Sequence, residues 1–205
     1  KTTVTLLLEH ILNSLGKKAK AGGNIGLPAL ELLKTNHEYN ILELSSFQLE
    51  MTKKISCLAS LITNITPDHL DRHKSFENYK YIKHKIFENS EKQIINRSDK
   101  NIYKTGKNIT FSFGSDNPPN NSSFGIEFSK GLNYVIKGKE RILCENEIKL
   151  LGRHNLENIC ASLAVINFLN LDINKALESI KDFNCVEHRM EKFYEKRNVH
   201  WINDS

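Results

Sequence analysis

Two short apolar segments on either side of a helical pattern constrain the fold of this chain most strongly. Residues 39–44 and 58–65 have the length and composition of buried strands, and residues 47–54 between them have a helical pattern. An amphipathic helix is also expected from Lys1 to Gly16, because apolar residues recur there at intervals of three and four. Strands that alternate with helices predict an α/β fold, in which helices flank a mostly parallel sheet.

A small antiparallel β portion is expected after residue 96. Short strand-like pieces at residues 109–113, 132–136 and 142–144 are joined by polar turns, which is the pattern of an antiparallel meander. Apolar spacing and capping residues predict the remaining helices. These begin at Pro28, after Ser75, at Asn155 and after Asp172.

The composition limits the class of protein. Hydrophobic residues make up 39% of the chain and charged residues 26%, which is typical of a folded globular protein. The net charge of +5 is spread along the chain, so it does not indicate a nucleic-acid-binding surface. Widely spaced cysteines and the lack of a long apolar run predict a cytoplasmic protein without a membrane span. Since the first residue is not methionine, we expect the sequence to come from a longer chain.

The first candidate site is the opening Lys1-Thr2-Thr3, at the start of the first predicted helix. These residues match the end of a phosphate-binding loop, in which a lysine contacts the terminal phosphates, a hydroxyl binds magnesium and helix N–H groups face the anion. The glycines that make this motif specific are absent from the sequence. A solvent-exposed helix start is therefore the simpler alternative.

Glu43 stands at the end of the first apolar strand. In open parallel sheets ligands bind outside such strand ends, where a carboxylate can hold a hydrated cation. An ordinary polar strand end is an equally good interpretation. Ser45 and Ser46 follow, and both are suited to cap the next helix.

The segment after the second apolar strand contains His69 and His73, four residues apart. On a helix this spacing can bind zinc, but no third ligand or thiolate has suitable spacing. A histidine beside carboxylates suits magnesium or manganese better. A surface histidine without a ligand is the alternative.

Lys83 falls on the apolar face of the helix that follows Ser75. Burial of an ammonium without a partner is costly and favours the neutral amine. A neutral lysine can react with carbon dioxide to form a carbamate, which is an anion that can bind metal. The alternative is a lysine whose stem covers apolar surface while its charge reaches water.

These features occur in one order along the chain and, with several longer segments, resemble the Mur ligases of peptidoglycan synthesis. GGNIGLPAL at residues 22–30 and LELSSFQLE at residues 42–50 are most similar to the members that add D-glutamate to UDP-N-acetylmuramoyl-L-alanine. Further similar segments lie at residues 64–72, 79–89, 152–155, 188–191 and 201–205.

The resemblance implies a domain organisation. Residues 1–185 would form a central ATP-binding domain and residues 186–205 the beginning of a C-terminal domain, with a hinge at residues 185–187. An N-terminal uridine-nucleotide domain would lie outside this sequence. A cytoplasmic monomer that acts on small molecules, and not on nucleic acid or membranes, is expected.

The resemblance also assigns site residues. The catalytic residues would be Lys1, Glu43, His69 and Lys83. ATP would be contacted by Lys1, Thr2, Thr3, Asn155, Asn158, Arg189 and Asp204. The muramoyl substrate would be contacted by Asn24, Ser45, Gln48 and His69. Two Mg²⁺ ions, or Mn²⁺, would be held by Thr2, Glu43, His69 and Lys83 as its carbamate.

The implied reaction is ATP-dependent amide formation through an acyl phosphate. Two alternatives stay open at this point. Another ligase of the same fold, adding a different amino acid or acting on folate, should lack the segment LSSFQ at residues 44–48. A nucleotide-binding module without catalysis is the second alternative, although every expected polar position in the covered region is present.

Overall fold

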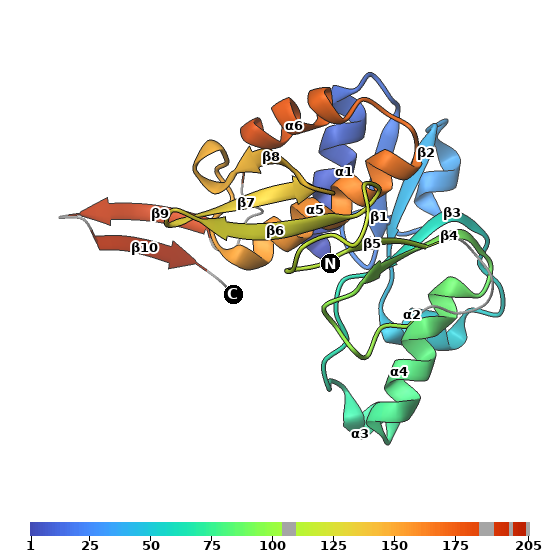
Figure 1. Cartoon of the computed structure of the whole chain (residues 1–205). Coiled ribbons are helices and arrows are strands. Elements are labelled where there is room, and N and C mark those ends of the chain that lie inside the picture. Colours follow the sequence, from blue (N-terminus) through green and yellow to red (C-terminus); the bar gives the residue numbers. More distant parts are fainter. Residues whose placement is uncertain (104–109, 185–190, 197–198, 204–205) are drawn as a thin grey trace.

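The computed structural model describes residues 1–103, 110–184, 191–196 and 199–203 (Figure 1). Its helices are α1 (Thr2–Ser14), α2 (Ser46–Met51), α3 (Leu70–His73), α4 (Phe76–His84), α5 (Arg153–Phe168) and α6 (Ile173–Asp182), with 3₁₀ turns η1 (Glu31–Lys34), η2 (Lys85–Phe87) and η3 (Glu145–Glu147). Its strands are β1 (Ala19–Gly23), β2 (Tyr39–Glu43), β3 (Cys57–Ile62), β4 (Ser90–Asn96), β5 (Thr110–Phe113), β6 (Phe124–Ser129), β7 (Leu132–Lys137), β8 (Glu140–Cys144), β9 (Glu191–Lys196) and β10 (Val199–Asn203).

The larger sheet has six strands in the order β3-β4-β5-β6-β7-β8. Strands β3 to β6 pair in parallel, whereas β6 with β7 and β7 with β8 pair antiparallel. Strands β9 and β10 form a separate antiparallel pair. The predicted α/β fold, with a mostly parallel sheet and a small antiparallel portion, is confirmed.

The boundary between the parallel and antiparallel parts differs from the prediction. We expected residues 109–113 to belong to the antiparallel meander, but β5 pairs in parallel with β4 and, at Phe113, with β6. The antiparallel part instead begins at β6, which we did not predict and which pairs with β7. The pairing direction depends on the connections between strands, so it cannot be inferred from the residues of β5 alone.

Within the described residues, a second parallel sheet consists of β1 and β2. Its register places Gly23 opposite Glu43. Gly23 has φ +102°, and a Cβ atom there would lie 2.4 Å from the Glu43 carbonyl oxygen, so this position requires glycine. Within the described residues β2 and β3 are not hydrogen-bonded to each other, and each has a strand partner on one side only.

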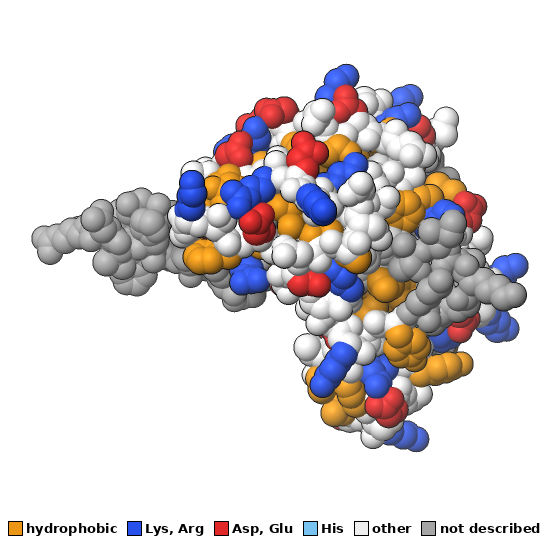
Figure 2. Space-filling model, viewed as in Figure 1, with side chains coloured by type: hydrophobic (Ala, Val, Ile, Leu, Met, Phe, Trp, Pro, Cys, Tyr) orange, Lys and Arg blue, Asp and Glu red, His pale blue; other side chains and the backbone are white. Residues whose placement is uncertain are grey.

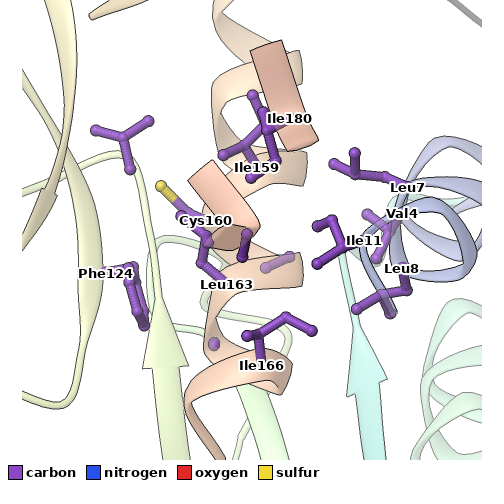
Figure 3. Packing of buried hydrophobic residues seen from close by; sticks show 14 of the residues in the cluster. Val4, Leu7, Leu8, Ile11, Phe124, Ile159, Cys160, Leu163, Ile166 and Ile180 are labelled. Carbon is purple, nitrogen blue, oxygen red and sulfur yellow. The ribbon is translucent and has the colours of Figure 1, made fainter. Parts of the chain in front are cut away.

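The main hydrophobic core lies where α1, α5 and α6 meet the sheets. Figure 3 shows Leu7 and Ile11 on α1 beside α5, which carries Ile159, with Phe124 of β6 on the other side of α5. All four of these side chains are fully buried. The apolar spacing that predicts the first helix therefore marks the face that packs into this core.

A second, smaller cluster packs α4 and η2 against β3 and β4. It contains Ile62, Ile65, Tyr79, Phe87 and Ile102. Helices α2, α3 and α4 lie together on one side of the molecule, away from α1, α5 and α6 (Figure 1). We call α2, α3, α4 and η2 the α2–α4 lobe, and α1, α5 and α6 with their sheets the main body.

The helix expected at Pro28 is reduced to the single turn η1. Leu30 and Leu33, which the expected helix would carry, are 75% and 74% exposed, and only Leu32 of this turn is buried. The exposed Leu30 and Leu33 have no surface to pack against, so tertiary packing does not stabilise a longer helix.

The predicted caps at Ser75 and Asp172 are confirmed. The Ser75 hydroxyl accepts a hydrogen bond from the backbone N–H of Asn78 at 3.2 Å, and the Asp172 carboxylate accepts one from the backbone N–H of Asn174 at 2.9 Å. None of the helices in the described part of the chain is long and apolar enough to cross a membrane. Basic and acidic side chains are interspersed on the face that Figure 2 presents.

Candidate functional site

The candidate site is built around Glu43, the last residue of β2. Its side chain is 3% exposed, and one carboxylate oxygen, Oε1, accepts hydrogen bonds from the Lys1 ammonium and from Asn24 Nδ2, the latter at 3.1 Å. The other oxygen, Oε2, is buried without a hydrogen-bond partner among the described residues. The parallel pairing of β1 with β2 brings Asn24 to this carboxylate. The backbone N–H of Asn24 also donates to the Glu43 backbone carbonyl at 2.7 Å.

The charge state of Glu43 follows from these neighbours. Burial by itself would raise the pKa of the carboxyl, but the hydrogen bonds from Lys1 and Asn24, together with the nearby Thr2 hydroxyl, outweigh it. The pKa of Glu43 therefore lies below its ordinary value, and the group is a carboxylate at neutral pH. The site thus presents a buried anion, one oxygen of which accepts no hydrogen bond from the described part of the chain and can bind a cation.

The start of α1 lies next to this carboxylate. Lys1 is the N-cap residue, Thr2 and Thr3 occupy the first two helical positions, and no side chain in the described part of the chain caps the first turn. The backbone N–H groups at such a helix start favour an anion, and the lysine ammonium adds to this effect. The arrangement can therefore hold a phosphate group close to Glu43.

Lys83 lies in the same region. Its side chain lines a cavity of about 490 Å³ that Lys1, Glu43 and Asn64 also line. Most other lining residues come from α1, β2 and β3, so the cavity lies between the two sheets. The Lys83 side chain therefore faces the candidate site.

The surroundings of Lys83 favour its neutral form. Burial lowers the pKa of the Lys83 ammonium and the nearby charge of Lys1 lowers it further, whereas Asp68 and Glu43 oppose these effects. The amine donates a hydrogen bond to the Tyr79 hydroxyl at 3.4 Å and lies 5.3 Å from the centre of the Tyr79 ring. Sequence reasoning did not assign Tyr79 a role at the site, although its spacing of four residues from Lys83 on a helix predicts contact.

The two histidines of the segment after β3 have different surroundings. His69, at φ +51°, precedes α3; its ring is about half exposed and lies 3.4 Å from a carboxylate oxygen of Asp68. His73 is buried, and its Nε2 lies 3.0 Å from the Ser46 hydroxyl. The structure therefore does not direct both rings at one ligand. Within the described residues, no three His, Cys, Asp or Glu side chains converge as a metal site.

Ser45 and Gln48 form the cap at the start of α2. The Ser45 hydroxyl accepts a hydrogen bond from the backbone N–H of Gln48 at 3.2 Å. In return, the Gln48 side-chain oxygen accepts one from the backbone N–H of Ser45 at 2.8 Å. This reciprocal arrangement is a capping box. It uses the side-chain oxygen of Gln48 but not its NH₂ group, so the cap is compatible with a further hydrogen bond from that group.

The other candidate residues lie elsewhere in the chain. Asn155 and Asn158 stand in the first two turns of α5, where Asn158 Nδ2 donates to Asn155 Oδ1 at 3.0 Å. Asn155 is buried and donates to the Leu151 carbonyl at 2.7 Å. Arg189, Asp204 and the hinge expected at residues 185–187 lie outside the described residues.

Comparison with known proteins places this geometry in a family. The family described as the Mur ligase middle domain matches residues 1–166. Curated relatives include UDP-N-acetylmuramoylalanine–D-glutamate ligases from Pasteurella multocida and Vibrio atlanticus, each 36% identical over 205 residues. These matches cover 100% of this chain and 46% of each relative, so the chain spans about half the length of the relatives it matches.

Solved structures show the same fold. UDP-N-acetylmuramate-alanine ligase from Thermotoga maritima is 25% identical with a TM-score of 0.71, and the match covers 100% of this chain and 48% of that one. The MurF ligase of the same organism, solved in complex with ADP, is 20% identical with a TM-score of 0.74 and is matched over 50% of its length. It also covers the whole of this chain. The chain described here belongs to the Mur ligase family and contains its middle domain.

Proposed function

We propose that this chain is the ATP-binding part of an amide ligase that joins D-glutamate to UDP-N-acetylmuramoyl-L-alanine. The observation that carries this proposal is the buried Glu43 carboxylate, which lies beside the Lys1 ammonium at the start of α1 and lines one cavity with Lys83. A helix start that can bind phosphate and an anion that can bind a cation are groups that phosphoryl transfer uses. The lowered pKa of Lys83 adds an amine that can form a carbamate.

ATP would bind with its terminal phosphates at the start of α1. The Lys1 ammonium would offset the charge of the phosphates, with Thr3 and the free N–H groups of the first turn as hydrogen-bond donors. The adenosine end would be held by Asn155, Asn158, Arg189 and Asp204, which we propose from resemblance. The MurF ligase solved with ADP shares the fold of this chain.

The residues around Glu43 fit a magnesium ion. Oε2 of Glu43 is buried and has no partner within the described residues, and the Thr2 hydroxyl lies at the same carboxylate. Hard cations prefer such carboxylate and hydroxyl oxygens. When bound, magnesium would neutralise charge on the transferring phosphoryl group. We propose Thr2 and Glu43 as ligands of one ion.

A second ion would need a further anion. His69 can supply a nitrogen, but Lys83 as an ammonium cannot bind a cation. The lowered pKa of Lys83 raises the fraction of neutral amine that can add to carbon dioxide with loss of a proton. We propose that the resulting carbamate and His69 hold the second magnesium.

The muramoyl substrate would lie between β1 and α2. Asn24, the NH₂ group of Gln48, Ser45 and His69 would orient its carboxylate towards the γ-phosphate of ATP. A carboxylate oxygen attacks phosphorus while the bond to ADP breaks, giving an acyl phosphate and ADP. The amine of D-glutamate then attacks the acyl carbon, phosphate leaves, and the nitrogen loses a proton to give the amide.

The choice of D-glutamate is supported by the names of the curated relatives. It is also supported by the segment at residues 42–50, which carries Ser45 as the N-cap of α2 and Gln48 in its first turn. We further propose that the ATP-binding domain extends to residue 185 and that residues 186–205 begin the next domain.

The decisive experiment measures phosphate release by the full-length protein with ATP, magnesium and UDP-N-acetylmuramoyl-L-alanine. The second substrate would be D-glutamate, L-glutamate, L-lysine, meso-diaminopimelate or none. We expect release only with D-glutamate. Release with a different amino acid would keep the ligase reaction and reject the specificity, whereas no release with any would favour a nucleotide-binding module without catalysis.

A further inference from the structure

Lys85 makes a set of contacts that the proposed reaction does not use. Its ammonium donates hydrogen bonds to three backbone carbonyls at the end of α2: those of Leu49 at 2.8 Å, Thr52 at 3.1 Å and Glu50 at 3.4 Å. The carbonyls at a helix C-terminus have no partner within the helix, and a cation there is favoured by the helix dipole. Lys85 therefore closes the C-terminus of α2 from the end of α4.

Helix α2 depends on such contacts because it has only six residues. A helix of this length is unstable by itself and persists only when its ends and faces are held. The capping box of Ser45 and Gln48 holds its start, and the Thr52 hydroxyl donates to the Gln48 carbonyl at 2.6 Å near its end. Lys85 adds the contact that joins this helix end to a different element.

The position of Lys85 relates two parts of the candidate site. It stands two residues after Lys83, and α4 passes directly into η2 at this point. Lys83 contacts Tyr79 and lines the cavity, whereas Lys85 reaches the end of α2. One short segment thus holds Lys83 at the cavity and fixes the helix whose first turn carries Ser45 and Gln48.

We propose that Lys85 is a positioning residue for the muramoyl-binding side of the site. Its ammonium holds α2 in a fixed place relative to Lys83, so that the side chains at the start of α2 face the substrate in one orientation. The part that concerns the substrate rests on the proposed function, whereas the part that concerns the order of α2 does not.

The test compares three variants of the full-length protein. Lys85→Met keeps the length of the stem and removes the donors, and Lys85→Arg restores a cation with several donors. Lys54→Met is the matched control, because Lys54 is exposed just after α2 and has no hydrogen bond or ion pair among the described residues. For each variant we would measure amide hydrogen exchange without ligands, KM for UDP-N-acetylmuramoyl-L-alanine and KM for ATP.

We expect Lys85→Met to speed amide exchange in residues 46–51 but not in α5, and to raise KM for UDP-N-acetylmuramoyl-L-alanine about tenfold, as loss of a charge-assisted hydrogen bond predicts. KM for ATP should stay within about twofold, as expected when the lost contact does not reach the nucleotide. Lys85→Arg should recover most of both effects, and Lys54→Met should show neither.

Two results would overturn the proposal. Unchanged exchange in α2 would show that Lys85 does not order this helix, whatever the enzyme does. Faster exchange in α2 with equal increases in both KM values would show a general loss of structure rather than positioning. A wild-type protein without ligase activity would instead reject the proposed function, and the exchange result would then decide the structural part alone.

Discussion

The α2–α4 lobe and the main body of the molecule are held together by different interactions. In the main body, long helices bury continuous apolar faces against the sheets, and side chains such as Leu7, Ile11 and Leu163 are completely enclosed. The lobe consists of short helices with a small apolar cluster. Polar contacts from Lys85, His73 and Arg72 reach α2, where the Arg72 guanidinium lies 3.0 Å from the Glu50 carboxylate.

The two kinds of interaction serve different purposes, stability in the main body and positioning in the lobe. Apolar burial in the main body supplies most of the driving force for folding, because it scales with the area removed from water. Hydrogen bonds and ion pairs add less stability but depend strongly on direction, so they set where a group lies. The lobe carries Lys83, Ser45 and Gln48, whose proposed roles depend on position. Changes in the lobe should therefore affect activity more than stability.

The largest effect is expected at Lys83. Lys83→Ala should lower turnover by about a hundredfold or more, because it removes the carbamate proposed to hold the second magnesium. Thermal unfolding should change little, because the substitution leaves no buried charge behind. Short carboxylic acids such as acetate should restore part of the activity by replacing the carbamate. Inactive protein that acetate does not rescue, with folding intact, would contradict the carbamate.

A core truncation should show the opposite pattern. Leu163→Ala, at a fully buried position in α5, should lower the free energy of unfolding by about 2–5 kcal/mol. We expect hydrogen exchange to accelerate throughout the main body. Ile65→Ala in the smaller cluster is the matched change, and its effect on exchange should be confined to the lobe. If Ile65→Ala accelerated exchange in α1 and α5 equally, the two regions would not be separate units.

Removal of the α2 cap should have a smaller effect on stability. Ser45→Ala should cost about 1 kcal/mol, since the hydroxyl satisfies an amide at the helix start. The change should appear in the exchange of α2 amides and as a higher KM for the muramoyl substrate. Ser75→Ala, which removes the corresponding cap of α4, is the comparison for a cap without a proposed substrate contact. Equal KM values for the two variants would show that Ser45 serves only as a cap.

The smallest expected effect is on how the stability of the main body depends on pH. The pKa of Glu43 is lowered in the folded chain, so its contribution to stability is complete above the pKa of the unfolded chain and is lost as pH falls through the folded value. Glu43→Gln should therefore weaken the pH dependence of unfolding at acidic pH, in the range below the ordinary pKa of a glutamate. Unfolding midpoints from pH 2 to pH 7 would measure this. Identical pH profiles for Glu43→Gln and the wild type would show that Lys1 and Asn24 do not stabilise the charged form.

Local features were predictable because they depend on nearby residues. The caps at Ser75 and Asp172 follow from residues only two or three positions apart in the chain, and the first helix follows from its apolar spacing. The expected helix at Pro28 was wrong because apolar residues alone do not provide a surface to pack against. The strand β5 was placed in the wrong part of the sheet because pairing direction is a property of distant segments.

In the candidate site, too, local features could be predicted and contacts between distant segments could not. Glu43 and Lys83 could be selected from sequence, since a carboxylate at a strand end and a lysine on an apolar face are unusual residues for their places. The hydrogen bond from Asn24 to Glu43 could not be derived from the pattern of either strand, because it depends on the register between β1 and β2. The contribution of Lys85 was equally hidden, since its partners are backbone carbonyls, which leave no trace in the sequence.

The break between the two sheets has a consequence for how this chain behaves in solution. Within the described residues, β2 and β3 each have one edge without a strand partner, and the cavity between them is lined by both. Unpaired strand edges accept extended backbone from other chains, and proteins usually protect them. We therefore expect self-association of this chain at high concentration to begin by strand addition at this gap, rather than by exposure of the main hydrophobic core.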